Sequence, residues 1–80
     1  LGWAYYRRGD VDEAEKYLAP AAQQMPRNAT VQDHLGDIFA KRKKWQDAIA
    51  AWTRALQGEE GEVNKTVVEK KIGDARGKLR

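Results

Sequence analysis

The 80-residue sequence contains neither cysteine nor serine. The lack of cysteine excludes disulfide bonds, thiolate zinc sites and a cysteine nucleophile, and the lack of serine removes the other common nucleophile of covalent catalysis. The sequence also has no glycine-rich phosphate loop of the strand-to-helix type. We therefore expect no enzymatic activity, no catalytic residue and no cofactor. Because cysteine-free proteins occur in reducing and oxidising compartments alike, the compartment, cytoplasm or periplasm, stays open.

Long apolar runs and a strong excess of one charge are missing too. No apolar run approaches the roughly 18 residues that a membrane-spanning helix needs. Hydrophobic residues make up 41% and charged residues 34% of the chain, which is typical of a globular protein. The formal net charge of +3 is too small by itself to indicate a nucleic-acid-binding protein. The composition predicts one small domain without a membrane span.

The most informative feature is a pattern that occurs twice. Its better copy consists of Leu35, Gly36, Phe39, Ala48, Trp52 and Ala55. The same pattern occurs 34 positions earlier as Leu1, Gly2, Tyr5, Ala14, Leu18 and Ala21. A period of this length, built from two helical halves, is the signature of a helical repeat. Because the sequence begins inside the first copy, we expect it to be the C-terminal part of a longer protein.

Apolar spacing and polar caps predict five helices. Their expected ranges are 1–8, 11–24, 29–42, 46–57 and a last helix that starts near Thr66. Gly9 is expected to end the first helix, and the expected N-caps of later helices are Asp10, then Asn28 or Thr30, then Thr66. Gly58 and Gly61 mark an acidic loop before the last helix. Lys71 is among the residues expected on the outer, solvent-facing side of that helix.

The predicted core is an apolar stripe on each helix. The stripes consist of Val11, Ala14, Tyr17, Leu18 and Ala21; Val31, Leu35, Ile38 and Phe39; Ala48, Ile49, Trp52, Ala55 and Leu56; and Val68, Ile72, Ala75 and Leu79. Gly36 is expected where two helices approach closely, opposite Ala48.

On these residues the chain resembles the tetratricopeptide repeat family. The resemblance implies an all-α fold, a right-handed superhelix of helix–turn–helix repeats with about five antiparallel helices. Residues 1–28 would be a truncated first repeat, 29–61 a second repeat and 62–80 a capping helix. Two departures are Gln32, where the family often has an aromatic residue, and Glu60, where it often has proline. The alanine-rich repeats suggest a bacterial source.

The resemblance also implies a function as a non-catalytic protein–protein interaction module. In this family the first helix of each repeat lines a concave groove that takes a peptide or helix of a partner. The groove residues would be Trp3, Tyr6, Thr30, Asp33, His34, Asp37 and Lys41. Trp3 and Tyr6 could equally pack on an upstream repeat. A structural alternative is an end cap of a longer array, or a homo-oligomer formed through the truncated N-terminal face.

Two clusters allow other interpretations. A basic ridge could bind an acidic ligand or nucleic acid; it comprises Arg7, Arg8, Lys41, Arg42, Lys43 and Lys44. The simpler interpretation is that these cations compensate helix C-termini, so nucleic acid is not the expected partner. His34 between Asp33 and Asp37 could serve acid–base or metal chemistry, but one helix supplies a poor ligand set and we expect no metal site.

Overall fold

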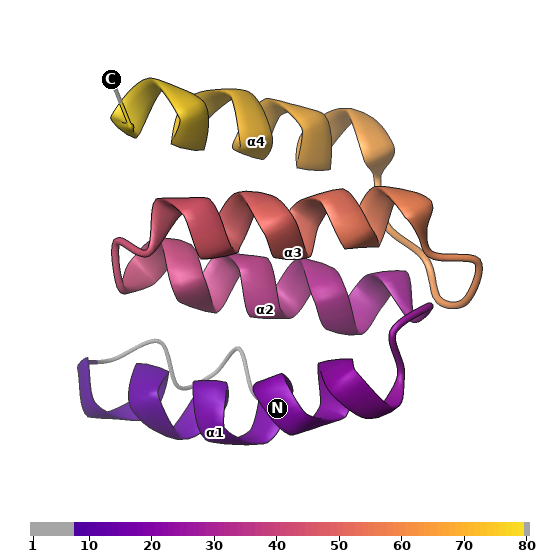
Figure 1. The fold of residues 1–80 in the computed structure, drawn as a ribbon, viewed down its shortest axis with the longest axis horizontal. Helices are drawn as coiled ribbons and strands as arrows, with labels where there is room; N and C mark the ends of the chain where they lie inside the picture. The colour runs from indigo at the N-terminus through magenta and orange to yellow at the C-terminus, as the bar shows by residue number, and fades with distance from the viewer. Residues whose placement is uncertain (1–7, 80) are drawn as a thin grey trace.

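The computed structural model describes residues 8–79, which form four α-helices. They are α1 (Arg8–Gln24), α2 (Ala29–Lys41), α3 (Trp45–Gln57) and α4 (Lys65–Lys78). Successive helices run antiparallel, α2 packs between α1 and α3, and α4 packs on α3 (Figure 1). The all-α prediction is confirmed, with four helices in the described part instead of about five. The predicted helix over 1–8 falls outside that part except for Arg8, which begins α1.

The helix starts agree with the prediction at one cap and differ at two. The side chain of Asn28 accepts a hydrogen bond from the backbone N–H of Val31 at 3.1 Å and caps α2. Gly9 and Asp10 lie inside α1, so the predicted break and cap there are wrong. Asn64, and not Thr66, caps α4, because asparagine caps at least as well as threonine and lies two residues earlier.

The turn between α2 and α3 closes the C-terminus of α2 with a Schellman motif. The backbone N–H of Lys44 donates to the carbonyl of Phe39 at 2.8 Å, and that of Lys43 donates to Ala40 at 2.9 Å. Lys43 takes the left-handed conformation, with φ 61°, at the position where such motifs usually have glycine. The ammonium of Lys44 lies 5.8 Å from the ring centre of Phe39. The predicted basic turn is therefore a well-defined helix stop.

The core follows the predicted stripes, with two exceptions. Ala48, Ala55, Val68 and Ile72 are buried around Trp52, which is 4% exposed. Tyr17 was expected in the core but is 79% exposed, because on a helix it lies about a third of a turn from the α2-facing stripe. Leu79 is 48% exposed, since it follows the last residue of α4.

Gly36 is a point of close approach between α2 and α3, as predicted, and the nearest side chain of α3 is that of Trp52. A Cβ atom at this position would collide with the indole ring of Trp52. The missing side chain lets α2 and α3 approach closely enough to bury that ring.

The loops that precede α2 and α4 are bonded to each other. The backbone N–H of Ala29 donates to the carbonyl of Glu60 at 2.6 Å, and that of Glu60 donates to the carbonyl of Arg27 at 3.0 Å. Gly61 has φ +76°, and a Cβ there would lie 2.7 Å from the hydroxyl of Thr30. The predicted acidic loop is thus an ordered part of the packing between repeats.

Gln32, which departs from the family pattern, is buried and fully engaged. Its Nε2 donates to the carbonyl of Ala22 at 3.1 Å, and its Oε1 accepts from Nε of Arg54 at 2.9 Å. With 1% exposure, this amide joins α1, α2 and α3 through hydrogen bonds.

Candidate functional site

One side of α2 carries the polar residues that the sequence predicted for a binding groove. The described members are Thr30, Asp33, His34, Asp37 and Lys41. At 100° per residue these positions fall within about 100° of arc, so they share one side of the helix. The first four are half-buried and Lys41 is exposed. Trp3 and Tyr6 lie outside the described residues, so their place in the groove stays a prediction.

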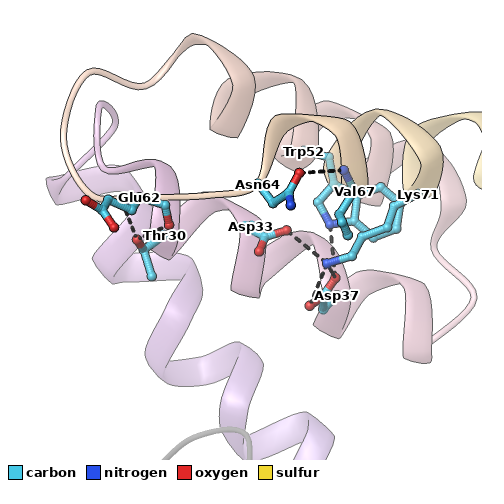
Figure 2. A network of polar contacts seen from close by, with 8 residues as sticks. All are labelled: Thr30, Asp33, Asp37, Trp52, Glu62, Asn64, Val67 and Lys71. Atoms are coloured by element: carbon cyan, nitrogen blue, oxygen red, sulfur yellow. Dashed lines mark hydrogen bonds and ion pairs between the residues drawn. The ribbon is translucent and has the colours of Figure 1, made fainter.

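Lys71 of α4 joins this side of α2 to the last helix. Its Nζ lies 2.9 Å from Oδ1 of Asp37 and 3.2 Å from Oδ1 of Asp33. The indole N–H of Trp52 donates to the same oxygen of Asp37 at 3.2 Å. Figure 2 shows the lysine reaching from α4 to the two carboxylates, with the indole beside them. We call the surface formed by Thr30, Asp33, His34, Asp37 and Lys71 the α2–α4 face.

The electrostatics of this network favour the charged state of Lys71. Partial burial lowers the pKa of Lys71, but the hydrogen bonds and charges of Asp37 and Asp33 outweigh it, so the pKa lies above its ordinary value. The ammonium also lies 5.9 Å from the ring centre of Trp52, within range of a cation–π attraction. Two carboxylates surround one ammonium, which leaves a net charge of −1 on the network. The side chains remain 18–30% exposed and can still meet a ligand.

These contacts correct the predicted position of Lys71. Lys71 was expected to face solvent, but its long side chain bends over the edge of α4 towards α2. Asp33 and Asp37, which were predicted to line the groove, both bind this internal cation, and their role in a groove stays a prediction.

The other two residues of the α2–α4 face, Thr30 and His34, differ in their contacts. The hydroxyl of Thr30 donates to the carbonyl of Glu62 and accepts from the N–H of the same residue, each at 3.0 Å (Figure 2). Thr30 therefore holds the loop before α4. His34 makes no such contact to the described residues and is the least committed side chain of the face.

Two of the described cations of the basic ridge, Arg42 and Lys44, form ion pairs within the protein. Arg42 Nη1 lies 2.7 Å from Oε1 of Glu15 and Nη2 lies 3.3 Å from Asp12, while Lys44 approaches the same oxygen of Glu15 at 3.5 Å. The hydrogen bond to Glu15 raises the pKa of Arg42. Two cations of the ridge therefore serve to fasten the turn to α1. Arg7 and the side chain of Arg8 lie outside the part of the chain that the structure describes.

Among the described residues, no three histidine, cysteine or carboxylate side chains lie close enough together to hold a metal ion. No helix within 8–79 is long and apolar enough to cross a membrane.

Sequence reasoning missed Lys71 and Trp52 as members of the site. The signal available was the pair Asp33 and Asp37, which four-residue spacing puts on one side of a helix. What the sequence could not supply was the partner, because Lys71 follows Asp33 by 38 residues and their contact depends on how the helices pack.

Comparison with known proteins agrees with the architecture. The family model described as a tetratricopeptide repeat-like domain matches residues 3–77. No curated protein matches the chain. The match covers nearly all of the sequence, including α1, α2, α3 and most of α4. The chain belongs to the tetratricopeptide repeat-like domain family.

Proposed function

We propose that the chain is a non-catalytic protein–protein interaction module whose α2–α4 face takes a peptide or helix of a partner protein. The main support is that this face is both fixed and accessible. Lys71 ties Asp33 and Asp37 together across two helices, and the three side chains stay partly exposed. A surface that is ordered before binding loses less conformational entropy on association. Tetratricopeptide-like domains generally bind other proteins, which points the same way.

The charges of the face favour a partner segment with a basic residue. Asp33 and Asp37 carry two negative charges against one positive charge on Lys71. A lysine or arginine of the partner would compensate the remaining charge through charge-assisted hydrogen bonds. Complementary charge of this kind contributes mainly to specificity and to the association rate. His34 lies next to the carboxylates and would contact the same segment.

Photo-crosslinking tests the location. Benzoylphenylalanine in place of His34 should form adducts with a partner protein, and the same group in place of Thr66 should not, because Thr66 lies on α4 opposite its packed side. Adducts from position 34 should decrease as unlabelled wild-type chain is added. Equal yields from the two positions would count against a binding role for this face.

The alternative role, as the end cap of a longer repeat array, is supported by the exposure of α4. α4 buries Val68, Ile72 and Ala75 against α3, while most of its other residues are exposed. A polar outer side is what the end of a repeat array requires. Light scattering over a concentration series separates this role from self-association, because an end cap stays monomeric and a homo-oligomer gains mass.

Binding of acidic ligands through the basic ridge has less support. Arg42 and Lys44 already neutralise Glu15 and Asp12. Salt-titrated binding of a nucleic-acid pool should therefore be weak and insensitive to Lys43→Glu.

A further inference from the structure

A second surface lies on the opposite side of α2. α1 and α3 both pack on α2, and between them is a cleft of about 410 Å³. Its floor is Leu35 and Phe39, and its walls include Ala22 of α1 and Ala50 of α3. Leu35 and Phe39 each follow an aspartate of the α2–α4 face by two residues, which is about 200° around the helix. This outer cleft is therefore separate from the face described above.

The outer cleft has an apolar interior between two opposite charges. Asp47 and Arg54 line it from α3, and both are exposed. They are seven residues apart on one helix, a distance of about 10 Å. The volume falls in the range of about 300–1,000 Å³ in which proteins bury ligand groups.

Arg54 is held in position by the buried amide of Gln32. Its Nε donates to Oε1 of Gln32 at 2.9 Å, and the amide is itself fixed by its bond to the carbonyl of Ala22. Because Gln32 uses only the Nε donor, the terminal nitrogens of the guanidinium are left for a carboxylate at the cleft. A pre-positioned arginine beside an apolar cavity is the composition of a binding hot spot.

We propose that the outer cleft binds a helical segment of a partner protein. The segment places large apolar side chains over Leu35 and Phe39, an acidic residue against Arg54 and a basic residue against Asp47. Residues seven apart on a helix span the same two turns that separate the two charges, so one helix satisfies both at once. A single-charged amphiphile such as a fatty acid fits less well, because its apolar tail would lie beside Asp47.

The probe is a 15-residue alanine-based helical peptide with Glu at position 4, Leu at positions 7 and 8 and Lys at position 11. Titration into the ¹⁵N-labelled 80-residue chain should give saturable shifts at the backbone amides of Leu35 and Ala50 and at the side-chain Nε–H of Arg54. Ala50→Trp fills the cleft from an exposed position and should weaken binding at least about tenfold. Thr66→Trp, a matched addition on α4, should leave the affinity unchanged. Circular dichroism verifies that both variants fold.

A charge exchange makes the test independent of the cavity variant. Asp47→Lys should lower the affinity for the peptide by about threefold to tenfold. Replacing the peptide's Lys by Glu should restore the affinity for this variant. The proposal fails if the peptide gives no saturable shifts, if Ala50→Trp has no effect, or if the doubly acidic peptide binds the wild-type chain as well as the original. Decanoate, a fatty acid, tests the alternative ligand. The proposal also fails if decanoate displaces the peptide from the cleft and binds the Asp47→Lys variant more tightly than the peptide binds the wild-type chain.

Discussion

Two glycines inside helices provide a matched test of the packing. Gly36 lies in α2 under the ring of Trp52. Gly73 lies in α4, and apart from the adjoining part of its own helix no atom lies within 4 Å of the position that its Cβ would take. In an exposed helix, replacing glycine by alanine stabilises by about 0.5–1 kcal/mol, through a smaller loss of backbone entropy on folding. Gly73→Ala should show this gain in full.

Gly36→Ala should have the opposite sign. The new methyl group would lie 2.8 Å from Cγ of Trp52 and closer still to other ring atoms, against about 3.4–4 Å for an ordinary contact. The indole is rigid, buried and hydrogen-bonded to Asp37. The steric clash with the new methyl group can therefore be relieved only if α2 and α3 move apart. Overpacking of this kind costs about 1–3 kcal/mol, which the gain in helix propensity offsets only in part. We expect a net loss of about 1–2 kcal/mol.

Urea unfolding followed by circular dichroism measures both variants against wild type. In thermal unfolding, the loss for Gly36→Ala corresponds to a Tm lower by roughly 4–16 °C and the gain for Gly73→Ala to a Tm higher by roughly 2–8 °C. Adding Trp52→Leu to each variant should abolish the penalty at Gly36 and leave the effect at Gly73 unchanged. The packing argument is refuted if Gly36→Ala stabilises the chain as much as Gly73→Ala does.

Three further substitutions test separate parts of the structure. Lys43→Gly should stabilise the chain by about 1 kcal/mol in urea unfolding, because glycine takes the left-handed conformation without the penalty of a side chain; a loss of stability would contradict the assigned turn. Gly61→Ala should destabilise by about 1–2 kcal/mol, since φ is +76° and the methyl group would crowd Thr30. Lys71 has a raised pKa in the folded state, so its contribution is complete below the unfolded value of about 10.4 and is lost as the pH rises further. The stability difference between wild type and Lys71→Met should therefore be constant from pH 7 to about 9 and shrink above about 10.4, and a difference that grows there would contradict the ion pairs.

The sequence predicted the features that depend on neighbours along the chain. The period of the pattern located the buried stripes, and Ala48, Ala55 and Val68 are among the least exposed side chains. The cap at Asn28 and the stop at the basic turn were also readable, because each is set by a few adjacent residues. Periodicity predicts a core direction well, but not the width of the stripe, and Tyr17 lies just beyond that width.

The features that the sequence did not predict depend on contacts between distant residues. The partner of Asp33 is 38 residues away on another helix, and the ring that occupies the space at Gly36 comes from α3. The cap of α4 is an exception, because Asn64 is a local feature that the prediction of Thr66 overlooked. The outer cleft follows only from how α1 and α3 lie on α2.

The most direct test of the proposed function is to map where the partner binds. The segment captured by crosslinking from position 34 would be titrated into the ¹⁵N-labelled chain, and amide shifts recorded by NMR. If the segment binds at the α2–α4 face, the largest amide shifts should occur at Thr30, His34, Asp37 and Lys71. The affinity for the segment should fall as the salt concentration is raised. Shifts absent from these residues, or concentrated on another surface of the protein, would contradict the assignment of this face as the binding site.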